Sequence, residues 1–241
     1  MSERMALVYG GADLSELCSV EVAERGCAAA EPSTREVPGR AGLAVTGGRL
    51  APLEIRAALT LRASGRMTAE ELSSARRRVA AALSRPGGAA LRIGDEPGLE
   101  WRGVTVKSCG EWSTLEEGGT CEVVFLAHDP VAYGTDVSIV DTPAFTVGGT
   151  APTWPRFRLV AASGSAVSVA AGGQKVRVER AFAAGDVVEI DCEAMTVAVN
   201  GADACAEATL TSCFFRLEPG ERELTVAGTS EFTAYFTERW L

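Results

Sequence analysis

The stretch that decides the fold runs from Val123 to Phe157, beginning VVFLAHDPVAYG (123–134) and ending GGTAPTWPRF (148–157). A strand-like apolar run ends there, and regular structure is then expected to stop. Proline gives no amide proton to a ladder and pushes the preceding residue out of helical geometry. The stretch therefore predicts a seam between domains of residues 1–134 and 155–241, with 135–154 as a linker. The prolines that interrupt it are Pro130, Pro143, Pro152 and Pro155.

The composition is that of a globular protein with many tight turns. Hydrophobic residues make up 46% and charged residues 23% of 241 positions, enough for two ordinary domains, each with its own core. Twenty-six glycines favour short strands joined by turns. The formal net charge of −9 gives no basic footprint for a duplex, so we expect no sequence-specific nucleic-acid partner.

Seven cysteines are scattered without a C-x-x-C pair, so neither a zinc site nor a thioredoxin-type site is indicated. Cys121 and Cys192 lie in apolar runs, where a free thiol behaves as a small hydrophobe. Reduced thiols are the expectation, and a disulfide framework is the alternative. No apolar window approaches the ~20 residues of a membrane span, and no export signal is recognisable, so we expect no membrane insertion.

The first half predicts an α+β domain in which one helix covers a mostly antiparallel sheet. The helix is expected over 68–84, with Thr68 and Glu71 forming a capping box and Met67 packing on Leu72. A shift of alternation at Gly103 predicts a β-bulge. A polar loop is expected over 32–42, turning at Pro38-Gly39. The predicted strands are 5–9, 19–24, 53–63, 90–93, 99–106 and 120–127.

The second half shows no helical periodicity and predicts an antiparallel β-sandwich. Asn200-Gly201 between apolar runs indicates a two-residue hairpin turn. The predicted strands are 156–160, 166–170, 175–179, 187–191, 195–199, 213–217, 223–227 and 232–236.

No motif for catalysis, cofactor binding or metal binding is found, and none of these sites is predicted. The single histidine, His128, ends a strand beside Asp129 without a nucleophile motif, so a local hydrogen bond is favoured over a catalytic base. The carboxylate pairs that could serve a glycosidase have evident turn roles, and the tryptophans are expected to pack. Those pairs are Asp186/Asp191 and Glu96/Glu100, and the tryptophans are Trp101, Trp112, Trp154 and Trp240.

Taken in order, several of these stretches resemble the distal tail protein family of bacteriophages with long flexible tails, including prophage versions. The resemblance covers essentially the whole chain, and it is the order and spacing of the motifs that carry it. The matching pieces are GGADLSELCSVEVAERG (10–26), STREVPGRAG (33–42), GRLAPLEIRAALTLRA (48–63), the capped helix, IGDEPGLEWRGVTV (93–106), VVFLAHDPVAYG (123–134), GGTAPTWPRF (148–157), AGDVVEIDCEAMTVAVNG (184–201), FFRLEPGERELTV (214–226) and YFTERWL (235–241).

The resemblance implies a structural protein of the virion tail tip, made in the host cytoplasm. It implies a ring, typically hexameric, built by the N-terminal domain and carrying a galectin-like C-terminal sandwich. The implied partners are further copies of the chain, the tail tube protein, the tail-associated baseplate hub protein and a receptor-binding protein. The family has no catalytic residues. If such a ring encloses a channel for DNA, part of the negative charge is expected to line it.

Two sets of residues follow as candidate contact sites. By analogy, the loop around VPGR belongs to the ring-forming half, with Arg35, Val37, Pro38, Arg40 and Leu43 as interface candidates. The inter-domain seam would use His128, Asp129, Pro130, Tyr133, Trp154 and Pro155. Two other functions remain open: a carbohydrate-binding module or adhesin that recognises host cell-wall sugar, and a hydrolase.

Overall fold

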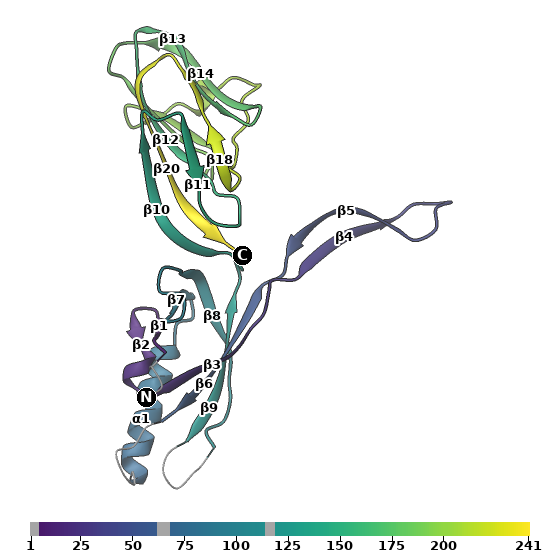
Figure 1. Cartoon of the computed structure of the whole chain (residues 1–241), viewed down its shortest axis with the longest axis vertical. Helices are drawn as coiled ribbons and strands as arrows, with labels where there is room; N and C mark the ends of the chain where they lie inside the picture. Colours follow the sequence, from purple (N-terminus) through teal and green to yellow (C-terminus); the bar gives the residue numbers. More distant parts are fainter. Residues whose placement is uncertain (1–4, 62–67, 114–118) are drawn as a thin grey trace. The chain divides into compact units, whose positions relative to one another are not determined.

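The computed structural model describes residues 5–61, 68–113 and 119–241, and the chain divides into two compact units. The first unit is Met1–Tyr133 together with Leu241, and the second is Gly134–Trp240. Both units are built mainly of antiparallel strands, and the described residues contain one α-helix (Figure 1). The fold class is the one predicted.

A seven-stranded antiparallel sheet forms the centre of the first unit, in the order β2-β1-β7-β8-β9-β6-β3. Strand β6 alternates between buried and exposed side chains along its whole length, which places one face against the core and one in solvent. The strands are β1 (Leu7–Tyr9), β2 (Ala12–Asp13), β3 (Ser19–Arg25), β6 (Leu53–Thr60), β7 (Ala89–Ile93), β8 (Trp101–Cys109) and β9 (Thr120–Ala127), and a short 3-10 helix, η1, covers Leu14–Glu16.

The helix α1 (Ala69–Leu83) begins as the sequence predicts. Thr68 accepts a hydrogen bond from the Glu71 amide, and the Glu71 carboxylate accepts one from the Thr68 amide. The hydrogen bond from the Thr68 amide to this carboxylate, followed by one from the Thr68 hydroxyl, lowers the pKa of Glu71. The predicted contact of Met67 lies outside the described residues. Val79, Ala82 and Leu83 are buried in the core of the first unit, so the helix packs on the sheet through one stripe.

Replacing Thr68 with alanine should destabilise the first unit by about 1 kcal/mol, because the Glu71 amide loses its capping partner. Urea unfolding followed by circular dichroism measures the change. Ser73→Ala, an exposed position inside the same helix, is the control and should alter stability by only a few tenths of a kcal/mol. Equal losses in the two variants would contradict the capping box.

The core of the first unit is organised by Tyr9 and Phe125, both fully buried, with ring centroids 5.2 Å apart. The Tyr9 hydroxyl donates to the Val104 carbonyl at 2.9 Å, which satisfies the polar end of a buried ring. Gly103 has a φ of 62°, and the register of β7 on β8 shifts at this point. The predicted bulge is therefore confirmed.

A long two-stranded hairpin stands where the sequence predicts a polar loop. Strands β4 (Ala30–Glu36) and β5 (Leu43–Leu50) pair with each other as a separate sheet, and we call them with their turn the arm (Figure 1). The turn itself is confirmed: Gly39 has a φ of 81°, and the Arg40 amide donates to the Val37 carbonyl. The loop prediction is wrong over residues 32–36, which belong to β4, and β5 was not predicted at all, because an arm exposed on both faces carries no apolar alternation.

The second unit is a sandwich of sheets around its own core. A six-stranded sheet has the order β10-β20-β12-β15-β16-β17, a three-stranded sheet the order β14-β13-β19, and β11 pairs with β18. The strands are β10 (Ala132–Val140), β11 (Ala144–Val147), β12 (Arg156–Ala161), β13 (Gly164–Ala171), β14 (Gln174–Phe182), β15 (Val187–Asp191), β16 (Thr196–Val199), β17 (Ala202–Asp203), β18 (Gly220–Glu223), β19 (Thr225–Ala227) and β20 (Thr229–Trp240), with a 3-10 helix, η2, at Cys205–Glu207.

Local turn chemistry is confirmed in the second unit, but one predicted strand is absent. Asn200 and Gly201 have φ values of 50° and 78° and join β16 to β17 as a tight hairpin. Residues 213–217 form no strand. Phe215 and Leu217 are buried, and Leu217 makes only an isolated bridge to Thr153. The apolar alternation of residues 213–217 therefore reflects packing into the core and not pairing with a neighbouring strand.

The expectation of irregular structure between the two halves is wrong. The predicted linker, residues 135–154, contains most of β10 and all of β11. Pro143 lies between these two strands, where it interrupts no ladder, and its carbonyl accepts from the Leu224 amide at 2.8 Å. Proline therefore marks the break between strands here and does not exclude strands on either side of it.

Candidate assembly surfaces

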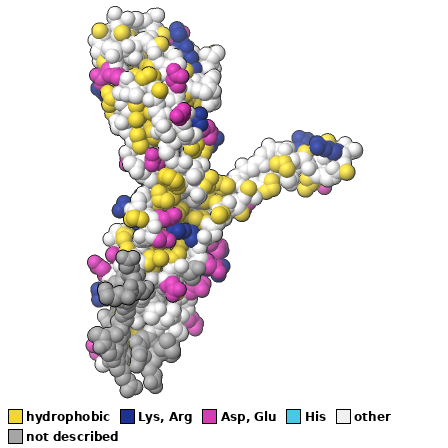
Figure 2. Space-filling model, in the orientation of Figure 1, with side chains coloured by type: hydrophobic (Ala, Val, Ile, Leu, Met, Phe, Trp, Pro, Cys, Tyr) yellow, Lys and Arg dark blue, Asp and Glu magenta, His cyan; other side chains and the backbone are white. Residues whose placement is uncertain are grey.

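The arm carries apolar side chains with no covering layer among the described residues. Leu43 and Val45 are 58% and 69% exposed, and Val37 is 40% exposed. Leu43 and Val45 are two residues apart on β5, so they lie on one face of the hairpin. Figure 2 shows hydrophobic side chains along the arm, with Lys and Arg side chains gathered near its tip. The predicted interface residues Arg35, Val37, Pro38, Arg40 and Leu43 are all exposed at this end of the arm.

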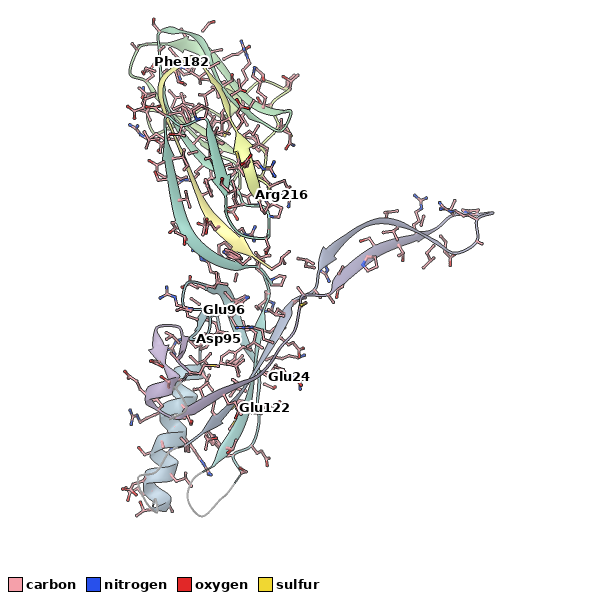
Figure 3. The ribbon with its side chains drawn as sticks, in the orientation of Figure 1. Glu24, Asp95, Glu96, Glu122, Phe182 and Arg216 are labelled. Atoms are coloured by element: carbon pink, nitrogen blue, oxygen red, sulfur yellow. The ribbon has the colours of Figure 1, made fainter. Side chains whose placement is uncertain are left out.

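The strand that leads into the arm is clamped to the sheet by Arg25. Its guanidinium group donates two hydrogen bonds to Asp95, at 3.0 and 3.2 Å, and lies 3.0 Å from Glu96. The same group lies over the buried Trp101 ring, 5.7 Å from the ring centroid. Figure 3 marks Asp95 and Glu96 at the turn that follows β7. A planar Arg fork shared by two carboxylates therefore holds the root of the arm.

The sheet face turned away from α1 is a mosaic of charges. Ile55, Ala57 and Leu59 of β6 belong to the core beneath the helix, so Glu54 and Arg56 point to the other face. Glu54 bonds to Lys107, and this hydrogen bond is the main cause that lowers the pKa of Glu54. Cross-strand pairing adds further carboxylates to this face. They are Glu21, Glu24 and Glu122, the last two marked in Figure 3.

The last residues of the first unit are held by a polar network. The Asp129 carboxylate accepts from the Val131 amide at 3.1 Å and from the Tyr133 hydroxyl at 2.9 Å. The Arg102 guanidinium lies over the Tyr133 ring, 4.2 Å from its centroid. Pro130 lies between the two ends of this turn and is buried. The network fixes the path of the chain up to Tyr133, the final residue before the second unit.

Replacing Tyr133 with phenylalanine should destabilise the first unit by about 1 kcal/mol, because a hydrogen bond to the Asp129 carboxylate is lost. Tyr235→Phe is the matched control, because the Tyr235 side chain on β20 is exposed. It should leave stability unchanged. Thermal unfolding by calorimetry measures both. A Tyr133→Phe protein as stable as the control would rule out a structural role for this hydroxyl.

Trp154 and Pro155 belong to the second unit. The Arg216 guanidinium lies 5.4 Å from the centre of the Trp154 ring, and the Pro155 carbonyl accepts from the Cys192 amide at 3.1 Å. Thr153, the residue before Trp154, is bound to β20, because its hydroxyl donates to the Thr237 carbonyl. These contacts secure the entry to β12. That these residues and those near Tyr133 form a single seam stays a prediction.

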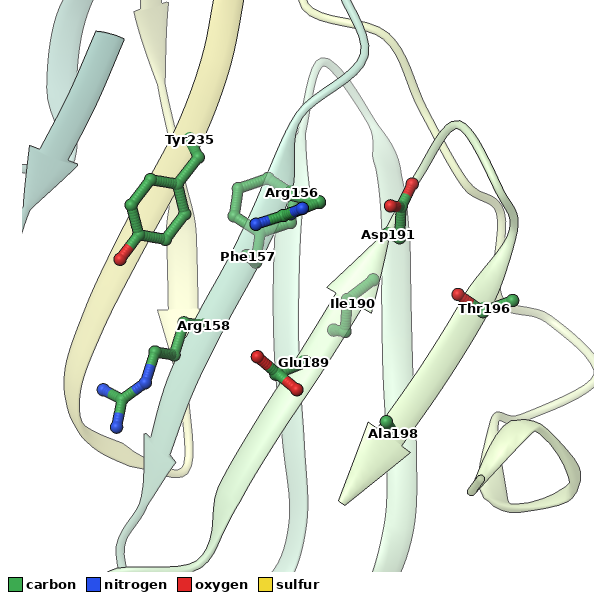
Figure 4. Close-up of a pocket in the computed structure, with 9 residues that line it drawn as sticks. All are labelled: Arg156, Phe157, Arg158, Glu189, Ile190, Asp191, Thr196, Ala198 and Tyr235. Carbon is green, nitrogen blue, oxygen red and sulfur yellow. The ribbon is translucent and has the colours of Figure 1, made fainter. Parts of the chain in front are cut away.

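The second unit also has a shallow hollow of about 320 Å³ on the outer face of its six-stranded sheet (Figure 4). Arg156 of β12 stands directly between Tyr235 of β20 and Asp191 of β15 in the strand register. The hollow mixes both signs of charge on a nearly flat sheet. Its lining residues are Arg156, Phe157, Arg158, Glu189, Ile190, Asp191, Thr196, Ala198 and Tyr235.

The residues considered for catalysis have structural partners. His128 Nε2 lies 3.0 Å from the Thr105 hydroxyl. Asp186 accepts from the Asn200 side chain and from the Ala183 amide, and these hydrogen bonds lower its pKa. Asp191 accepts from two amides of the following turn. In the described part of the chain, no three His, Cys, Asp or Glu side chains gather in a group that could hold a metal ion.

The arm is the feature that sequence reasoning missed. Strand β4 is mostly polar, and β5 has three apolar residues in succession followed by Thr46 and two glycines, so neither strand shows the alternation that signals a half-buried strand. One signal was available. The Pro38-Gly39 turn has oppositely charged residues on its two flanks, Glu31 and Arg49, and these two pair at 2.9 Å in the structure. Within the described residues, no helix is both long and apolar enough to cross a membrane.

Comparisons with known proteins agree on one family. Residues 148–240 match the family model described as siphovirus-type tail component, C-terminal domain. The distal tail protein of Bacillus phage SPP1 is 28% identical over 253 residues, covering 98% of this chain and 95% of that protein. The crystal structure of the SPP1 Dit protein superimposes with a TM-score of 0.82 at 20% identity, covering 98% of this chain and 99% of that one.

That structure is described as a paradigm of the hub adsorption apparatus in phages that infect Gram-positive bacteria. The family model covers most of the second unit, and the matches to the SPP1 protein and to its structure cover both units. Residues 148–240 therefore resemble a siphovirus-type tail component, and the chain as a whole resembles the distal tail protein of phage SPP1.

Proposed function

We propose that this protein is a structural subunit of a phage tail tip, a hub that joins the tail tube to the receptor-binding apparatus. The similarity to the SPP1 distal tail protein over 98% of the chain carries this proposal. The arm supports it independently. Leu43 and Val45 are exposed apolar side chains on a hairpin whose root is held by Arg25, as expected for an element that another subunit covers in an assembly.

The subunits form a closed ring, typically of six copies, and the first unit builds it. Arg35, Val37, Pro38, Arg40 and Leu43 contact the neighbouring copy. A head-to-tail contact of this kind closes into a ring when each subunit is rotated by the same angle. The galectin-like second unit lies on the outside of the ring.

The further partners are the tail tube protein on one side and the baseplate hub and receptor-binding proteins on the other. The protein is made in the host cytoplasm and resides at the tail tip. Its role is non-enzymatic: His128, Asp186 and Asp191 have hydrogen-bond partners that account for them. The comparisons do not favour a carbohydrate-binding module as the main function.

The charged face of the first sheet lines the channel of the ring. Four glutamates, Glu21, Glu24, Glu54 and Glu122, oppose Arg56 and Lys107 there. A net negative wall would limit adhesion of passing DNA. Replacing Glu21 and Glu122 with lysine should therefore create retention of duplex DNA on the assembled ring, measured by filter binding at low salt.

Ring formation is tested on the purified full chain. Multi-angle light scattering and negative-stain images should show a closed ring of uniform subunit number. The fraction of protein in this ring should rise with protein concentration. A protein that stays monomeric at high concentration, also when mixed with its tube and hub neighbours, would overturn the proposal.

A further inference from the structure

We propose that Cys109 and Cys121 form an oxidation site, a dithiol that closes to a disulfide between β8 and β9. Their sulfur atoms lie 3.5 Å apart, and both thiols are free in this structure. Cys109 is exposed at the end of β8, whereas Cys121 is buried at the start of β9. The Cys109 thiol can therefore react with a soluble oxidant, while the Cys121 thiol is shielded from solvent beside it. The site does not rest on the proposed function.

The position of Cys121 is set by the backbone on both sides. The Gly110 amide donates to the Glu122 carbonyl at 2.8 Å, and the Ser113 amide donates to the Thr120 carbonyl at 2.9 Å. These bonds continue the pairing of β8 and β9 beyond the last residue of β8. The Cys121 thiol itself donates to the Gly110 carbonyl at 3.1 Å. The ladder thus holds the buried sulfur next to Cys109.

Closing the bond requires a small movement. A disulfide brings the two sulfurs to about 2.05 Å, and the Cys109 side chain, which would move toward its partner, is exposed. Cys109 pairs with Val123, two residues from Cys121, so the two cysteines lie on the same face of the sheet as diagonal neighbours.

The chemistry proceeds by thiol–disulfide exchange with a small disulfide such as oxidised glutathione. The Cys109 thiolate attacks one sulfur of glutathione disulfide, forming a mixed disulfide and releasing one glutathione thiolate, which takes up a proton. Cys121 then gives its proton to water and attacks the Cys109 sulfur, which releases the second glutathione. Two protein thiols and one glutathione disulfide become one protein disulfide and two glutathione thiols.

The second step sets the pH dependence. Burial, followed by the hydrogen bond with Cys109, raises the pKa of Cys121 to about 12. Between pH 7 and pH 9 the fraction of Cys121 thiolate rises about tenfold for each pH unit, and the rate of closure should rise with it. The disulfide then constrains the unfolded chain between the two cysteines. The melting temperature of the oxidised first unit should rise by about 5 °C or more.

The experiment uses the full-length chain. The protein is incubated with oxidised glutathione at pH 8, quenched with acid, alkylated, and mapped as peptides without reduction. Cys109→Ser is the test variant, and Cys27→Ser, at another exposed cysteine of the first unit, is the matched control. Wild type and Cys27→Ser should yield the linked Cys109–Cys121 peptide and the higher melting temperature. Cys109→Ser should yield neither.

Three outcomes would overturn the proposal. Recovery of glutathione only as a stable adduct on Cys109 would show that Cys121 does not reach it. Cys121 could be linked to Cys18 instead, which would assign the buried thiol to another partner. A third outcome is wild-type protein that keeps all of its thiols under conditions that oxidise an exposed reference dithiol.

Discussion

Replacing both Leu43 and Val45 with aspartate should convert the ring into monomers. The two side chains lie on one face of the arm and are 58% and 69% exposed, so in an assembly they would be the apolar groups that the neighbouring copy covers. Burying two carboxylates without partners costs several kcal/mol, which corresponds to a loss of at least about 100-fold in the association constant. Sedimentation velocity over a concentration series measures the shift.

The fold of the monomer should be unaffected, because the arm contributes no residue to the core of the first unit. A matched control is Leu210→Asp, the same kind of change at a fully exposed position of the second unit. This control should assemble like the wild type. If the arm variant forms rings at wild-type concentrations, the arm is not the subunit contact, whereas rings lost equally in both variants would indicate a general effect of added charge.

Replacing Gly149 with alanine should destabilise the second unit by about 3–4 kcal/mol. Its φ is +95°, which costs an L-residue about 1–2 kcal/mol. A Cβ built there would also lie 2.2 Å from the Arg239 carbonyl oxygen, and backbone cannot yield as a flexible side chain does. Overpacking of this kind adds about 1–3 kcal/mol. Gly149 belongs to the motif GGTAPTWPRF and brings that motif against the end of β20.

Gly173 separates the two causes. Its φ is +82°, yet no atom lies within 4 Å of a Cβ built there. Gly173→Ala should therefore cost only the conformational part, about 1–2 kcal/mol. Chemical denaturation of both variants gives the difference directly. Equal losses would mean that the approach of Arg239 to Gly149 is not a constraint on this fold.

Most of the regular structure could be predicted because it rests on local patterns. The helix has its capping box within four residues, β6 alternates along its length, and Asn200-Gly201 turns as its dihedral preferences require. Predictions were wrong where a strand lacks a buried face, and where a proline lies between two strands and not inside one. The arm is wet on both faces, and β10 and β11 lie beside a proline that interrupts neither of them.

The candidate surfaces were only partly foreseen. The residues of the arm tip were named from the family resemblance, but the hairpin that presents them was not predicted. The clamp at its root joins Arg25 to Asp95, which are 70 positions apart. No motif or spacing in the sequence indicates that these two residues are in contact. Likewise, Cys109 and Cys121 appear as two unrelated thiols until β8 and β9 are paired.

The sequence by itself determined the local elements and the family resemblance, because caps, turns and alternation act within a few residues and the resemblance rests on their order. Only the tertiary structure decided which strands are neighbours. That choice depends on burying two separate cores and on closing long loops, and these free energies are summed over residues far apart in the chain. The exposed arm, the Arg25 clamp and the cysteine pair all follow from that choice.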